Sequence, residues 1–276
     1  MPVTVPEMAT GRSGTATHRV VDDCRRAVDV PRSPRRVISL CPSMTETVAA
    51  LAPEVLVGRT RYCIHPDPLV AGVPTVGGTK NPDIEAIAAL QPDLILAEKE
   101  ENRREDVEAL AAIAPVFVCD VHTVTEALSM IRQLGSLLDG AQARAEAWTQ
   151  RITAGWADLP RWPGRPRVLY LIWRKPWMAA GGDCYIHSVL EELGMVNVLA
   201  DQPRYPTLDA TQMAALRPDH VFLSSEPYPF RERHRREVQC LLPAARVDCV
   251  DGEAFSWYGV RMEPALAHLR QLVAAA

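Results

Sequence analysis

Two residues well suited to chemistry lie two positions apart in the stretch RYCIHP, residues 61–66. The thiol of Cys63 and the imidazole of His65 could bind Zn or Cu, or act as a nucleophile and its base. His65 alone could also be an axial ligand to a bound cobalt ion. Two ligands are too few for a metal site, and a histidine in a proline-rich loop usually only forms hydrogen bonds. We therefore predict no resident metal and keep His65 as the single candidate ligand.

Aromatic and cationic side chains gather in two short stretches, WRKPW at 173–177 and FSWYGVR at 255–261. Aromatic residues make up only 6% of the chain, yet these stretches hold three of its six tryptophans. Flat rings stack on flat ligands, although they also build cores and interfaces. The cations could bind an anionic ligand group or form salt bridges. The side chains concerned are Trp173, Trp177, Trp257 and Tyr258, with Arg174, Lys175 and Arg261.

A sequence repeat points to two further carboxylates. Residues 88–100 read AALQPDLILAEKE and residues 214–226 read AALRPDHVFLSSE, with six identical positions. The shared Pro-Asp has a structural explanation, because Pro ends a helix and Asp accepts hydrogen bonds in the turn before a strand. The ends of the two stretches differ, but Glu100 and Glu226 occupy equivalent positions. We predict that they face each other, where they could pair with cations or hold a metal-bound group.

The elements that must position these residues follow one pattern. From residue 36 to 121, short β-branched strands alternate with helices in the order β-α-β-α-β, and similar elements recur about 130 residues later. This order argues for a mostly parallel sheet in each half. Between the halves, residues 123–160 keep apolar residues at helical spacing, with Gly135 and Gly140 as the only weak points. We predict one long helix there, with any kink near those glycines.

The predicted fold is α/β: two similar lobes with mostly parallel sheets, joined by one long α-helix. We expect a flexible N-terminal arm at 1–34 with a short strand at HRVVDD, a first lobe at 35–121, the interlobe helix at 122–160 and a second lobe at 161–276. In open α/β sheets, ligands bind beyond the carboxyl ends of the strands. The candidate ligand-binding residues are therefore those in strand-end loops: Tyr62, Cys63, His65, Lys99, Glu100, Asn102, Trp173, Arg174, Lys175, Trp177, Ser225, Glu226, Trp257, Tyr258 and Arg261.

Several functions are disfavoured by what the sequence lacks. It contains no GxSxG, P-loop, GxGxxG or HExxH motif, so we predict a protein that is not an enzyme and needs no catalytic cofactor. The alternative is a small-molecule hydrolase or transferase that uses Cys63 with His65, or Glu100 with Glu226. A formal charge of -4 without a strongly basic segment argues against a nucleic-acid partner.

The location of the protein follows from its apolar runs and cysteines. No stretch approaches the ~20 apolar residues of a membrane span. The N-terminus lacks the apolar run of a secretory signal. The seven cysteines are odd in number and form no CxxC pair, which suits a reducing compartment. As written, the sequence predicts a cytoplasmic chain that does not span a membrane; the alternative is an exported chain whose signal has been removed.

A family resemblance rests on four stretches: RVISLCPSMTE, VGGTKNPDIEAIAALQPDLILA, LEELGMVNVLAD and MAALRPDHVFLSS. Over about residues 35–275 the chain resembles the helical-backbone metal receptors, the cobalamin- and iron-siderophore-type substrate-binding proteins of ABC importers. The resemblance implies two Rossmann-like lobes joined by a single long helix. It also implies a cobalamin-like corrinoid or a ferric chelate bound between the lobes without chemistry, and a periplasmic or extracytoplasmic location.

The same resemblance implies an ABC permease as a partner. In this family, one acidic residue on each lobe docks on arginines of the permease. The matching residue of the first lobe is Glu85, in NPDIEAI. Its repeat equivalent is Thr211, which has no charge, so the predicted substitute is Asp209, two residues earlier.

Overall fold

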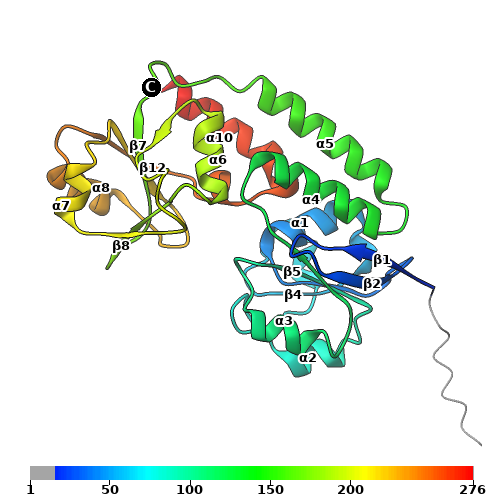
Figure 1. The fold of residues 1–276 in the computed structure, drawn as a ribbon. Coiled ribbons are helices and arrows are strands. Elements are labelled where there is room, and N and C mark those ends of the chain that lie inside the picture. Colours follow the sequence, from blue (N-terminus) through cyan, green and yellow to red (C-terminus); the bar gives the residue numbers. More distant parts are fainter. Residues whose placement is uncertain (1–15, 276) are drawn as a thin grey trace, which may run out of the picture.

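The computed structural model describes residues 16–275 and shows two α/β lobes side by side (Figure 1). It begins with an antiparallel hairpin of β1 (Thr17–Val21) and β2 (Ala27–Pro31). Asp22 and Val30 are buried, and the Arg26 side chain donates to the Val116 carbonyl at 2.9 Å. The prediction of a flexible arm is therefore wrong for residues 17–31, because this hairpin packs on the first lobe. The part of that prediction on residues 1–15 lies outside the described residues.

The first lobe is built on a four-stranded parallel sheet in the order β4-β3-β5-β6. Strands β3, β5 and β6 are buried along their whole length, as expected for a parallel sheet that is covered on both faces. The strands are β3 (Val37–Ser39), β4 (Leu56–Arg59), β5 (Leu94–Glu98) and β6 (Val116–Cys119). The helices are α1 (Pro42–Leu51), α2 (Ile84–Ala89) and α3 (Arg104–Leu110), with 3-10 turns at Pro53–Val55 and Val70–Gly72.

The second lobe has a mixed sheet in the order β10-β8-β7-β11-β12, with β9 also paired to β7. Strands β7, β11 and β12 are parallel, whereas β8 and β10 add an antiparallel edge. The strands are β7 (Arg167–Trp173), β8 (Trp177–Ala179), β9 (Val196–Asn197), β10 (Thr207–Leu208), β11 (His220–Ser224) and β12 (Arg246–Val250). The helices are α6 (Tyr185–Glu192), α7 (Ala210–Ala215), α8 (Glu232–Leu241), α9 (Glu253–Ser256) and α10 (Met262–Ala274), with a 3-10 turn at Gly259–Arg261.

The two lobes repeat one structural unit. Strands β3, β5 and β6 pair in the same order and direction as β7, β11 and β12. The Asp93 carboxylate accepts the backbone N–H of Arg36 at 3.0 Å, and the Asp219 carboxylate accepts that of Arg167 at 2.8 Å. In each lobe, the Asp of the Pro-Asp pair thus links the start of its own strand to the start of the neighbouring strand. This geometry confirms that the shared part of the repeat is structural.

The chain passes between the lobes through two helices, α4 (Val124–Leu137) and α5 (Gln142–Ala157), which pack against each other (Figure 1). The prediction of one long helix is therefore wrong. The turn contains Gly140 in a left-handed conformation, with φ of +67°. Gly135 allows the close approach, because a Cβ there would lie 2.3 Å from the Cβ of Ala145. Both glycines thus serve a helical hairpin rather than a kink.

Helix α5 carries the connection from one lobe to the other. Near its start, the Arg144 side chain donates to the Leu51 carbonyl of the first lobe at 2.5 Å. Near its end, the Trp156 indole donates to the Met262 carbonyl, at the start of α10, at 3.2 Å. Helix α5 is thus fixed to both lobes.

One hydrophobic cluster runs through both lobes rather than stopping at their boundary. It includes Met44 of α1, Ile131 of α4, and Tyr170 and Phe255 of the second lobe. Two smaller clusters lie under α2 and α3 in the first lobe and under α7 and α8 in the second. The lobes therefore share a core that runs across their boundary.

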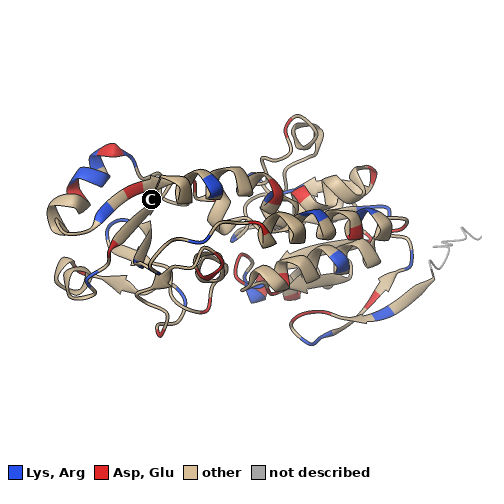
Figure 2. Ribbon diagram, turned by 90° about the horizontal axis from the view of Figure 1, so that it is seen from above, with Lys and Arg blue, Asp and Glu red and all other residues tan. Residues whose placement is uncertain are grey.

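The surface charge is mixed in sign. Figure 2 shows Lys and Arg interspersed with Asp and Glu over both lobes, in keeping with the small formal charge of -4. Among the helices of residues 16–275, none is long and apolar enough to cross a membrane.

Candidate functional site

The lobes meet where α1 of the first lobe packs against residues 257–261 of the second. The backbone N–H of Tyr258 donates to Ser43 Oγ at 3.2 Å, and that of Val260 donates to Thr47 Oγ1 at 3.3 Å. Helix α1 follows β3, and residues 257–261 follow β12 and α9. This joint therefore brings the strand-end edges of the two sheets to the same boundary, where the fold predicts a ligand.

Three residues predicted to bind a ligand form part of this joint. Trp257 and Tyr258 are 9% and 7% exposed. The Tyr258 hydroxyl lies 3.6 Å from Cys41 Sγ, and burial raises the pKa of Tyr258. Arg261 forms an ion pair with Glu46 of α1 at 2.9 Å. The structure uses these side chains to hold the lobes together, and their contact with a ligand remains a prediction.

Trp173 and Trp177 lie at the strand-end edge of the second lobe, beside aromatic partners that the sequence analysis missed. Trp173 ends β7, is 39% exposed and meets the ring of Tyr228 edge-on at 5.5 Å. Trp177 stacks on Phe230 with a centroid distance of 6.3 Å and an interplanar angle of 3°. Both partners come from the EPYPF loop after β11, where alternating Pro and aromatic residues were the available signal.

The two cations between Trp173 and Trp177 differ in their contacts. Arg174 forms two hydrogen bonds with the Glu237 carboxylate of α8, at 2.9 and 2.7 Å, and this pairing raises the pKa of Arg174. Arg174 therefore takes the salt-bridge role that was the alternative to ligand binding. Lys175 is exposed. In the first lobe, Lys99 Nζ pairs with Asp120 Oδ2 at 2.5 Å.

The loop after β4 carries the first-lobe candidates. Cys63 is fully buried, and its Sγ lies 3.1 Å from the hydroxyls of both Thr45 and Thr60. Burial raises the pKa of the Cys63 thiol, which makes it a poor nucleophile and a poor metal ligand. Its neighbour Tyr62 is 53% exposed. The structure therefore separates a buried thiol from an exposed ring in one short loop.

The His65 side chain makes contacts across the lobe boundary. Its Nε2 lies 3.1 Å from Glu253 Oε2, and its ring meets Trp257 edge-on at 5.3 Å. Both partners belong to the second lobe. Within residues 16–275, no three His, Cys, Asp or Glu side chains are grouped so that they could hold a metal ion.

Two buried residues, Asn102 and Glu98, stabilise the turn after β5 through hydrogen bonds. Asn102 is buried; its Nδ2 donates to the Thr79 carbonyl at 2.9 Å, and its Oδ1 accepts the Glu98 N–H at 2.8 Å. Glu98, which the sequence analysis missed, is 2% exposed and accepts the N–H groups of Glu100 and Glu101 at 2.7 and 2.8 Å. Burial raises the pKa of Glu98 to about 8. Its only signal in the sequence was its place at the end of a buried strand.

The two equivalent carboxylates have different partners. Glu100 Oε1 lies 3.0 Å from Arg204 Nη2, which belongs to the second lobe. Glu226 stays within its own lobe, where Ser256 Oγ donates to Oε1 at 2.7 Å, and burial raises the pKa of Glu226. The neighbouring Ser225 Oγ accepts a backbone N–H at 2.8 Å. Neither carboxylate therefore has the other as a partner, and Arg204 was not found from the sequence.

Comparison with known proteins now identifies the family. Residues 37–239 match the family described as periplasmic binding protein. The vitamin B12-binding protein of Salmonella typhi is 27% identical over 197 residues, which cover 69% of this chain and 73% of that protein. The chain belongs to the periplasmic binding protein family, which consists of substrate-binding proteins. The resemblance noted in the sequence is thereby confirmed.

Solved structures agree with the fold. The catecholate-siderophore-binding protein of Vibrio cholerae superposes with a TM-score of 0.75 at 15% identity, over 95% of this chain and all (100%) of that one. A periplasmic haem-binding protein from Pseudomonas aeruginosa superposes with a TM-score of 0.71 at 24% identity, over 88% of this chain and 94% of that one. The predicted two-lobed α/β class is confirmed.

Proposed function

We propose that this chain is a non-enzymatic receptor for a corrinoid or another large metal chelate, held between the strand-end edges of its two lobes. The observation that carries this proposal is an exposed aromatic ring on each edge: Tyr62 at 53% and Trp173 at 39% exposure. Exposed large rings at a boundary where the fold predicts a ligand favour a flat, apolar-faced partner.

The ligand class is supported by the relatives. Their names specify vitamin B12, haem and a catecholate siderophore, all of which form metal complexes with flat or aromatic faces. At the strand-end edges of this chain, Tyr62 and Trp173 offer rings, and exposed Lys175 offers a cation for a peripheral carboxylate or phosphate. The metal would be bound within its chelate, so the protein would need neither a resident metal nor a catalytic cofactor.

A titration tests this proposal. Hydroxocobalamin, hemin and a ferric tris-catechol complex are each added while tryptophan fluorescence and absorption are recorded. We expect saturable binding of at least one probe, weakened by Trp173→Ala or Tyr62→Ala by about 1–2 kcal/mol, or roughly 5- to 30-fold in Kd. Trp148→Ala is the matched control, because Trp148 lies on α5 under the Arg151 guanidinium, 4.1 Å away. Failure of all three probes to bind, or an equal loss in the control, would refute the proposal.

The alternative enzymatic function has less support from the contacts. The Cys63 thiol is buried with a raised pKa, and Glu100 is paired with Arg204. We expect no consumption of a p-nitrophenyl ester above the buffer rate. Turnover that disappears in Cys63→Ser, or in Glu100→Gln with Glu226→Gln, would favour the hydrolase instead.

A permease partner is part of the same proposal. Glu85 in the first turn of α2 and Asp209 at the N-cap of α7 are both exposed. The Asp209 carboxylate accepts the Gln212 N–H at 2.8 Å, as Asp83 caps α2. Because Asp209 is the repeat equivalent of Asp83, we expect Glu85 to contribute more to docking. In a pull-down with a candidate permease in nanodiscs, Glu85→Ala should weaken binding more than Asp209→Asn, and Glu108→Ala on α3 should have no effect.

The location of the chain is proposed from its relatives and weighed against its cysteines. The relatives in solved structures are periplasmic by name, and all seven cysteines of this chain are free. We propose a periplasmic location, in line with these relatives, and keep a cytoplasmic one as the alternative. Cell fractionation with N-terminal sequencing of the native protein separates these outcomes.

A further inference from the structure

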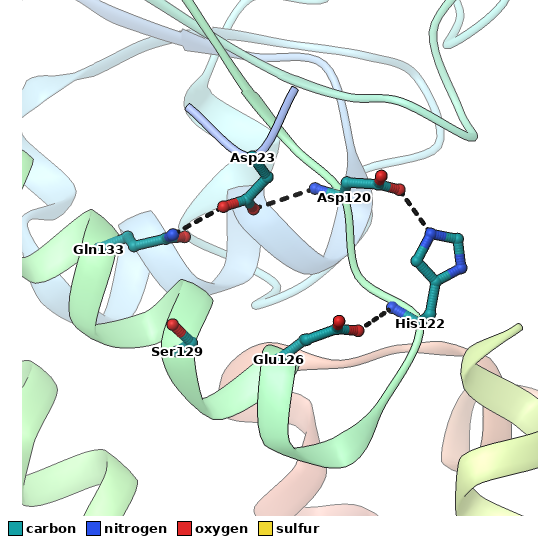
Figure 3. A pocket seen from close by; sticks show the side chains of 6 residues that line it. All are labelled: Asp23, Asp120, His122, Glu126, Ser129 and Gln133. Atoms are coloured by element: carbon teal, nitrogen blue, oxygen red, sulfur yellow. Dashed lines mark hydrogen bonds and ion pairs between the residues drawn. The ribbon is translucent and has the colours of Figure 1, made fainter. Parts of the chain in front are cut away.

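His122 lies between β6 and α4, where the chain leaves the first lobe (Figure 3). Its Nε2 is 2.6 Å from Asp120 Oδ1, and its Nδ1 is 2.7 Å from the main-chain carbonyl oxygen of Asp183 in the second lobe. Both partners are acceptors without a proton to give. Two such contacts therefore require a proton on each ring nitrogen, which means a charged imidazolium.

The surroundings of His122 favour that charged state. Burial lowers the pKa of His122, but the Asp183 carbonyl and the Asp120 carboxylate more than offset this effect, so that the pKa is raised. Glu126 of α4 adds a negative charge, and its carboxylate accepts the backbone N–H of His122 at 2.8 Å. A cavity of about 230 Å³ adjoins the ring (Figure 3). Other charged or titratable groups around the His122–Asp120 pair include Asp23 and Cys24 of the hairpin turn, Lys99 after β5, Arg204 near Lys99, and Asp183.

A series of contacts leads from His122 to Glu100, one of the candidate ligand-binding residues. The Asp183 carboxylate accepts the backbone N–H of Arg204, which adopts a left-handed conformation with φ of +58°. The Arg204 guanidinium then reaches back to Glu100 of the first lobe, with Nη2 and Oε1 3.0 Å apart. The path crosses the lobe boundary twice. We call these five residues, Glu100, Asp120, His122, Asp183 and Arg204, the interlobe latch.

We propose that His122 is a positioning residue whose protonation closes the interlobe latch and thereby sets the separation of the two strand-end edges. When the imidazolium loses one proton, the remaining N–H stays with the Asp120 carboxylate, because a charged acceptor is stronger than a carbonyl. Nδ1 then presents a lone pair to the Asp183 carbonyl at 2.7 Å, which is repulsive. The contact between the lobes is therefore present at low pH and lost as pH rises through the pKa of His122.

Two measurements on the ligand-free protein test this proposal. The first is an NMR titration of the imidazole nitrogens of His122, which should both be protonated at about pH 6, close to the ordinary histidine pKa of ~6.5. The second is a spin-label distance between Ala109→Cys on α3 and the exposed Cys240 on α8, with Cys24 and Cys249 replaced by Ser. We expect this interlobe distance to lengthen as pH is raised through the titration of His122.

Two variants complete the test. His122→Gln does not titrate, so its label distance should stay constant over the same pH range. His187→Gln is the matched control, because His187 contacts Glu191 and Asn197 within the second lobe, and this variant should respond like the wild type. A wild-type distance that does not change, a response that persists in His122→Gln, or an unprotonated ring nitrogen at about pH 6 in the NMR titration would overturn the proposal.

The effect of the latch on ligand affinity rests on the function proposed above, whereas its opening does not. Because the distance and NMR measurements use no ligand, their outcome is independent of whether a corrinoid or chelate binds. If the chelate proposal holds, wild-type affinity for the probe that binds should change with pH in step with the label distance, and that dependence should be absent in His122→Gln. Affinity that varies with pH equally in both proteins would show that the latch does not act on the ligand site.

Discussion

Gly259 is the position at which one added methyl group should most clearly disturb the joint between the lobes. Its φ of +77° lies in the left-handed region that favours glycine. A Cβ there would lie 2.2 Å from Thr47 Oγ1, and 3.2 Å from both Met130 Cε and the Ser43 carbonyl oxygen. The Thr47 hydroxyl also accepts the Val260 N–H at 3.3 Å, so it has to move out of an existing hydrogen bond.

The cost of Gly259→Ala has two parts. The left-handed backbone should cost a residue with a Cβ about 1 kcal/mol. Crowding at Thr47, with the loss of its bond to Val260, should add about 2 kcal/mol. The sum of about 3 kcal/mol corresponds to a fall in Tm of roughly 10 °C for a chain of this size.

Thermal and urea unfolding provide the assay, and the chain offers a matched control. Gly164 has a nearly identical φ of +76°, but a Cβ there would meet nothing within 4 Å. Gly164→Ala should therefore show only the backbone part, about 1 kcal/mol. If the two variants lose the same stability, the close contact between Gly259 and α1 does not hold the lobes together as described.

Other contacts lead to further expectations. Asp93→Ala removes the acceptor of two backbone N–H groups, at 2.8 and 3.0 Å, whereas Asp219→Ala removes the acceptor of one, at 2.8 Å. In urea unfolding, Asp93→Ala should therefore lower the free energy of unfolding by about 2 kcal/mol and Asp219→Ala by about 1 kcal/mol. Equal losses in the two variants would contradict this count of hydrogen bonds. Because burial raises the pKa of Glu98 to about 8, the native state keeps a proton that the unfolded state releases near pH ~4.3. The stability that this proton contributes is complete below about pH 4 and is lost as pH rises toward about 8. The difference in the free energy of unfolding between wild type and Glu98→Gln should therefore change by up to a few kcal/mol over that range. A constant difference would argue against a raised pKa of Glu98. In the native protein, Cys63 should react with iodoacetamide far more slowly than exposed Cys240, as mapped by mass spectrometry, and similar rates would mean that the Cys63 thiol is accessible.

The fold could be predicted largely because its signals are local. Helix and strand periodicity, with Pro-Asp between them, identified the repeated units around Asp93 and Asp219. Helix α8 has no such signal of its own, because its sequence, ERHRREVQCL, contains too few apolar residues to show a period. The interlobe helix was predicted as one piece, because both members of a helical hairpin have the same period. Only the left-handed Gly140 and the close contact at Gly135 show where the chain turns back.

The candidate site was less predictable, because its contacts join residues far apart in the chain. The rings at 173–177 were found from their composition, but their partners Tyr228 and Phe230 come from another strand-end loop. Glu100 was expected to face its repeat equivalent Glu226. A repeat fixes the place of a residue within its own lobe, however, and says nothing about its partner across the boundary.

The sequence by itself determined the two α/β lobes, the structural role of Pro-Asp and the membership of a substrate-binding family, because each depends on short-range patterns of apolar, Pro and Gly residues. Tertiary structure alone decided which side chains are free and which are engaged: it buried Cys63, placed Trp257 and Tyr258 in the joint, and brought His122 and Arg204 to the boundary. The physical reason is that burial and ion pairing depend on distances between segments, and these are set only when the lobes pack on their shared core.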